Sequence, residues 1–336
     1  MSLPPLGDLS QSHATRLSIA RLTRELTSLG KEVTTGLAAD VAGRMKGDTA
    51  PLAALERGLG AVSAYQTAVS ETKILTAATQ LSLERSQGRL GELAEKAITA
   101  TSGNGTGTSI DAVAREARNG FLGMVADINA SASGMRLFAG VATDGPATRS
   151  GEEILADIAA AAAGATGAAE LDAAIDAYFA PGGAFEANDY LGAAVSRAPV
   201  AVAPGEAADF APRADADEIR AGLKALARVA VLDAGALDGN GAARREVVTA
   251  SVTEAKGAES GLIALQARGG MVEEQLERAG ARAGAERGAL ERARLDMIAV
   301  DPYEAATRLE QTQVQLQSLY AITARLSRLN LSDYMR

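Results

Sequence analysis

The sequence predicts a mainly α-helical protein: a long antiparallel helical rod, or coiled-coil bundle, built from both chain ends, with a small mixed α/β insert domain at the far end. Both ends carry apolar residues at coiled-coil spacing, and only 3% of the 336 residues are aromatic although Ala is abundant. Cores of Ala and Leu suit long, closely packed helices, whereas aromatic residues usually dominate the burial of thick globular centres.

The C-terminal segment, residues 301–336, has the pattern of one amphipathic helix. Thr312 and Thr323 share the register of its leucines, and Pro302 falls in the first turn, where proline is tolerated. The residue before a proline is biased out of the helical conformation, so Asp301 marks a joint with the helix before it. The leucines at the a and d heptad positions are Leu309, Leu316, Leu319 and Leu326.

The N-terminal segment, residues 1–48, contains the mate of this helix. We expect a helix over about 12–36, followed by a glycine-punctuated turn. A chain whose two ends each form half of a coiled coil is built to join something through its ends, so we predict an assembly seam. Its N-terminal residues step by three and four and are Ile19, Leu22, Leu26, Leu29 and Val33.

Rod helices are predicted over 49–140 and 242–300. The first begins at about Thr49, an expected N-cap, and continues to about residue 99, a length of about 70 Å at 1.5 Å per residue. A Gly-rich stretch follows, and a shorter helix begins near Ile110. Since two long apolar stripes bury each other best when their helices run antiparallel, we expect the segment between them to lie at one end.

That segment, residues 141–241, differs in composition. Between Asp144 and Asp238 there are 16 acidic and 6 basic side chains, which accounts for the whole net charge of −9. This acidity argues against nucleic acid as a partner, because phosphates need a basic surface. We expect a peripheral domain with helices at 152–163, 170–179 and 216–233 and strands at 195–203 and 207–210.

No catalytic, cofactor-binding or metal-binding residues are predicted. His13 is the only histidine and there is no cysteine, so catalytic triads and His or thiolate metal sites lack their parts. The glycines at 103–107 lack the lysine of a phosphate-binding loop and are interpreted as an inter-helix turn. The acids at Asp215, Asp217 and Glu218 are interpreted as complementing a helix dipole rather than holding a cation. We therefore expect no enzyme.

No apolar run approaches the length needed to cross a bilayer, so membrane insertion is not expected. The first residues contain no apolar segment with a small-residue cleavage site, so we expect no cleaved signal peptide. A protein that leaves the cell with this sequence needs a route that reads no cleaved signal.

Three blocks of sequence resemble the flagellin family. The first is LGKEVTTG at 29–36. The second is LFAG at 137–140 with TDGP at 143–146, which resembles the hook-associated members at the hook–filament junction more than flagellin itself. The third extends from DPYEAATRL at 301–309 to LSDY at 331–334 and is similar to the closing helix of the family.

This resemblance implies a structural protein of the extracellular bacterial flagellum, exported uncleaved and partly unfolded by the flagellar type III apparatus. It implies ring assembly with copies of itself between the hook-side junction protein and flagellin, after an export chaperone has held the C-terminal helix. Two alternatives stay open: flagellin, the filament subunit, and an unrelated coiled-coil interaction protein of the cytoplasm.

Overall fold

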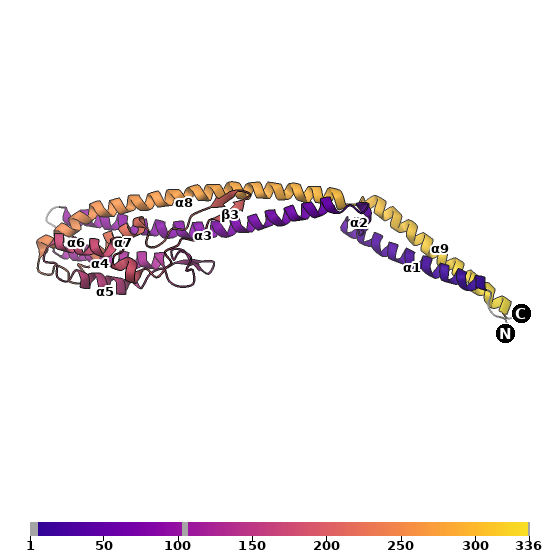
Figure 1. Ribbon diagram of the computed structural model, residues 1–336, viewed down its shortest axis with the longest axis horizontal. Helices are drawn as coiled ribbons and strands as arrows, with labels where there is room; N and C mark the ends of the chain where they lie inside the picture. The colour runs from indigo at the N-terminus through magenta and orange to yellow at the C-terminus, as the bar shows by residue number, and fades with distance from the viewer. Residues whose placement is uncertain (1–5, 103–106, 335–336) are drawn as a thin grey trace. The chain divides into compact units, whose positions relative to one another are not determined.

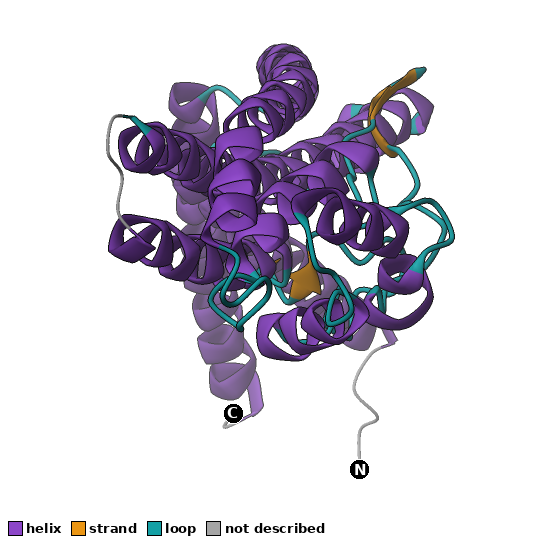
Figure 2. Cartoon of the chain, turned by 90° about the vertical axis from the view of Figure 1, so that its left-hand side faces the viewer, coloured by secondary structure: helices purple, strands orange, loops and turns teal. Residues whose placement is uncertain are grey.

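The computed structural model describes residues 6–102 and 107–334, and its side chains are described for residue 10 and for residues 13–102 and 107–325. The chain divides into two compact units, residues 1–63 with 284–336 and residues 64–283. The prediction of a mainly α fold with long packed helices and a small mixed part is confirmed. Figure 2 shows how little of the chain is strand. None of the described helices is long and apolar enough to cross a membrane.

The first unit pairs the two ends of the chain. Its helices α1 and α9 lie side by side along their length (Figure 1). An antiparallel bridge joins Leu37 to Ala299, so the end of α1 meets the start of α9. The helices of this unit are α1 (Leu6–Thr35), α2 (Val41–Arg44), α9 (Pro302–Tyr334), the start of α3 (Ala50–Thr101) and the end of α8 (Gly241–Ile298).

The segment after α1 and the segment before α9 leave the helical conformation at the same level. Gly36 adopts φ +70°, which L side chains rarely adopt, and this lets α1 stop. The Val300 amide then donates to the Gly36 carbonyl, and the Ala38 amide donates to the carbonyl of Ile298. The predicted joint before Pro302 therefore coincides with a second joint after α1.

The second unit is built on α3 and α8, which run antiparallel. Lys73 forms an ion pair with Glu277 at 2.7 Å, and further along the pair the Gln80 amide donates to the carbonyl of Gln266 at 2.9 Å. The other elements of this unit are α4 (Gly107–Ile128), β1 (Ser131–Ala132), β2 (Met135–Arg136), α5 (Gly151–Ala161), α6 (Ala168–Phe179), the π-helix η1 (Phe185–Asp189), β3 (Val200–Ala203), β4 (Glu206–Ala208) and α7 (Asp217–Ala230).

The predicted helices of the insert are present as α5, α6 and α7. The predicted strands are shorter than expected, and they form an antiparallel hairpin, β3 with β4, around Gly205 at φ +73°. Val202 of this hairpin is fully buried and packs with Val69 of α3 and Leu276 of α8. The hairpin thus covers the two long helices and does not form part of a larger sheet.

The core of the insert is continuous with that of the long helices. Phe121 of α4, Leu223 of α7 and Leu90 of α3 are each completely buried in one cluster. Gly222 of α7 lies so close to Met124 of α4 that an added Cβ would stand 2.7 Å from the methionine methyl. The small residue at this position thus lets α7 approach α4 closely.

Candidate assembly interface

The predicted seam residues lie along α1 and α9, which pack against each other. On α1, Leu29 is 7% exposed, and Ile19, Leu22, Leu26 and Val33 are half-buried. On α9, Ala305 and Thr312 are buried, and three of the predicted leucines are half-buried: Leu309, Leu316 and Leu319. Leu326 lies in α9, outside the residues whose side chains are described. The burial matches the heptad spacing, while a role of these residues in assembly stays a prediction.

The opposite faces of the two helices also carry apolar side chains. Val314 of α9 is 60% exposed, Tyr303 is 83% exposed, and Leu17 of α1 is 57% exposed. Val314 lies two residues from the seam position Thr312, which puts it about half a turn around the helix. Sequence reasoning missed this outer face, although the spacing of Tyr303 and Val314 by three turns was visible in the sequence.

An open groove of about 780 Å³ lies along the outer side of α1 and ends at the turn that follows it. Arg24 and Lys31 are its charged residues, seven positions apart, and no acidic side chain lines it. The rest of the lining consists of small or apolar residues: Ala20, Thr23, Thr27, Ser28, Thr35, Leu37, Ala38 and Ala39.

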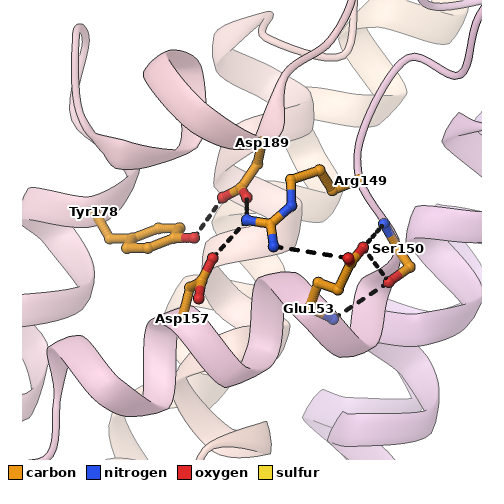
Figure 3. Close-up of polar contacts among 6 residues, drawn as sticks. All are labelled: Arg149, Ser150, Glu153, Asp157, Tyr178 and Asp189. Atoms are coloured by element: carbon orange, nitrogen blue, oxygen red, sulfur yellow. Dashed lines mark hydrogen bonds and ion pairs between the residues drawn. The ribbon is translucent and has the colours of Figure 1, made fainter.

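The insert contains a polar network around the buried Asp189 that sequence reasoning did not single out (Figure 3). The Arg149 guanidinium donates to Asp157 Oδ2 at 2.6 Å and to Asp189 Oδ1 at 3.0 Å, and the Tyr178 hydroxyl donates to Asp189. Burial raises the pKa of the fully buried Asp189 carboxyl, and burial likewise raises the pKa of Tyr178. A carboxylate with no exposure cannot meet a substrate, so this network fixes η1 and α6 around α5.

A second network joins three helices through Arg228 of α7, whose side chain is 3% exposed. Its guanidinium forms ion pairs with Asp172 Oδ1 of α6 at 3.0 Å, with Asp176 Oδ1 at 3.2 Å and with Glu254 of α8. Burial raises the pKa of Asp172. Such an arrangement ties α6, α7 and α8 together.

The other sites weighed from the sequence have ordinary surroundings. Glu218 forms an ion pair with Arg268, Asp215 pairs with Arg213, and Asp217 pairs with Arg220. Among the described residues, no group of three or more His, Cys, Asp and Glu side chains could hold a metal ion. His13 is exposed on α1, and the predicted Gly-rich turn lies outside the described residues except for Gly107, the first residue of α4.

Comparison with known proteins gives matches to a family model and to solved structures. Residues 252–335 match the family model of the bacterial flagellin C-terminal helical region. A solved structure from Vibrio parahaemolyticus, assigned as a flagellar hook-associated protein, has the same fold over 73% of this chain and 95% of that chain, with 16% sequence identity and a TM-score of 0.54. No curated protein matches the sequence. The resemblance to the flagellin family is thereby confirmed, and the matched region covers most of α8 and all of α9.

Proposed function

We propose that this flagellin-family chain is a structural subunit of the bacterial flagellum, a hook-associated protein that joins hook to filament and corresponds to hook-associated protein 3. The observation that supports this proposal best is the α1–α9 pair. Its two helices pack on each other through one seam and keep apolar side chains, Val314 and Leu17 among them, on their outer faces. A helix that is apolar on two opposite faces needs a second partner to bury the second face.

The partners follow from this role. Copies of the chain form a ring, with the hook-side junction protein on one side and flagellin on the other, in the extracellular flagellum. Export precedes assembly and uses no cleaved signal peptide, and an export chaperone holds the C-terminal helix meanwhile. An isolated amphipathic helix is marginal in water, which is why the ends need a chaperone before they pair. The chain acts through packing and not as an enzyme.

Flagellin itself is the second candidate, because the matching family model describes the C-terminal region of flagellins. The two functions differ in copy number, since a filament subunit occurs along the whole filament and a junction protein forms one short ring. Labelling the chain on isolated hook–basal bodies with attached filaments separates them. We expect label at the hook–filament boundary alone. Label along the filament would establish flagellin, and absence of label from the isolated structures would overturn both proposals.

Leu319→Asp tests whether the seam serves assembly. Leu319 is half-buried between α1 and α9, so the change removes up to about 1.5–3 kcal/mol of side-chain burial and puts a charge into the seam. We expect the melting of the rest of the monomer to be unchanged and the label at the hook–filament boundary to be lost. Ser318→Asp introduces the same charge at the exposed neighbouring position and is the matched control. Normal motility of the Leu319→Asp strain would remove this residue from the assembly seam.

A further inference from the structure

The outer face of α9 has a heptad pattern of its own. Its members step by four and three, as seam residues do, but all of them are exposed. Tyr303 and Val314 are its large apolar members, and Glu310 lies between them. The stripe consists of Tyr303, Thr307, Glu310, Val314, Gln317 and Ala321.

The groove on α1 complements this stripe in size. Its lining residues Ala20, Thr27 and Ala38 are small and lie on the flank of α1 or in the turn that follows it. Small side chains on one helix let the large side chains of another approach, which is the basis of close helix packing. The large members Val314 and Tyr303 thus meet a surface with room for them.

The two surfaces also complement each other in charge. The groove carries Arg24 and Lys31 and no acid, whereas the stripe carries the carboxylate of Glu310 and no base. The side chains of Lys31 and Glu310 are exposed, and within the described part of the chain neither forms an ion pair. Each of these two side chains can therefore form an ion pair with a second molecule.

We propose that the outer stripe of α9 in one copy docks antiparallel into the α1 groove of a second copy. This inference rests on the proposed function and specifies its copy-to-copy contact. One register places five of the six stripe residues opposite residues that line the groove. It pairs Glu310 with Lys31, Gln317 with Arg24, Val314 with Thr27, Ala321 with Ala20, and Tyr303 with Ala38. Large residues then face small ones, and the acid faces a base.

The symmetry of this contact follows from its two unlike surfaces. A stripe on one copy and a groove on the next form a heterologous contact, which repeats into a ring or a helix and does not close as a dimer. Counting from the Leu37–Ala299 bridge puts Lys31 level with Ala305 of its own chain, and the proposed register puts it level with Glu310 of the neighbour. The neighbour therefore lies within about two helical turns of the same level, as lateral neighbours do.

Disulfide cross-linking tests the register directly because the chain contains no cysteine. Thr27→Cys and Val314→Cys are combined in one full-length chain, and the purified protein is concentrated, oxidised and run on a non-reducing gel. The two sites lie on outer sides of α1 and α9, away from their common seam, so a bond forms only between copies. We expect a ladder of dimers, trimers and higher species. The purified chain needs no flagellum, so the result is independent of where the protein resides.

The matched control combines Thr27→Cys with Ala321→Cys, on the same face of α9 but two turns further along. We expect at least about tenfold less cross-linking from this pair, because a disulfide spans Cα atoms no more than about 7 Å apart. Equal ladders from both pairs, or no ladder from the first pair at any concentration, would overturn the proposed docking.

A charge exchange gives the second measurement. Lys31→Glu and Glu310→Lys each place like charges together, and each should weaken self-association about threefold in sedimentation at low salt. The double variant Lys31→Glu with Glu310→Lys should restore it. If the double variant is weaker than either single variant, the two residues do not meet. If it restores self-association but the label is absent from flagella, the docking stands and the proposed function fails.

Discussion

The terminal pair α1–α9 and the unit of residues 64–283 bury their residues differently. Among the described side chains of α1 and α9, only Leu29, Ala305 and Thr312 fall below a tenth of full exposure. In the second unit, Phe121, Phe138 and many others are buried to 1% or less. The second unit therefore has a well-packed core of its own, whereas the terminal pair has one narrow seam and leaves apolar side chains exposed on its outer face.

This difference shows which part of the chain can fold alone. Because the seam buries few side chains, its packing offsets little of the free-energy cost of helix nucleation. Packing against a partner then has to supply the rest of the stability of these helices. The second unit adds charged networks around Arg228 and Arg149 to its apolar core, which cross-link helices that are distant in sequence. We expect the free monomer to be ordered in residues 64–283 and labile at its ends.

Hydrogen exchange should give the largest contrast between the two regions. Amides of α4 and α7 should exchange only through global unfolding, at a free energy of about 5–15 kcal/mol. Amides over roughly the first and last 35 residues should exchange through local opening that costs only a few kcal/mol. Mass spectrometry of the purified monomer measures both. Equal protection of both regions in a verified monomer would refute the difference argued here.

A pair of Leu→Ala substitutions on α3 measures the depth of the second core. Leu90 is completely buried, so Leu90→Ala should lower the free energy of unfolding by about 3–5 kcal/mol. Leu81 is 46% exposed on the same helix, and Leu81→Ala should change the free energy of unfolding by no more than about 0.5 kcal/mol. Urea unfolding of both variants tests the prediction. Similar losses for both would mean that the core is shallower than its burial indicates.

Sequence periodicity could predict the long helices and the seam because both depend on patterns that repeat every three or four residues. Val62, Val69, Leu83 and Leu90 of α3 follow one another at intervals of seven or fourteen residues, and all four are buried. The shared core of α4 and α7 could not be predicted, because it depends on long-range approaches such as that of Gly222 to Met124. The networks of Arg149 and Arg228 were hidden for the same reason, since their acids lie on other elements.

An effect smaller than that of Leu90→Ala is expected at the start of α5. Ser150 and Glu153 form a capping box there, in which the Ser150 hydroxyl and amide donate to the Glu153 carboxylate. The hydrogen bond from the Ser150 side chain is the main cause that lowers the pKa of Glu153, followed by the bond from the Ser150 backbone. The ionised form is thus favoured in the folded state.

The sign of the pH dependence follows from this lowered pKa. An acid whose pKa is lower folded than unfolded stabilises the fold above its unfolded pKa, and that contribution is lost as the pH falls through the folded pKa. Glu153→Gln should therefore flatten the decrease of the unfolding midpoint below about pH 4.5, where an unperturbed glutamate titrates. Ser150→Ala should flatten it similarly and cost about 1 kcal/mol at neutral pH through the lost cap. Glu92→Gln, at an exposed position of α3, is the control and should leave the profile as in the unmodified chain. A profile equally steep in Glu153→Gln would show that this carboxylate does not couple to the folding of α5.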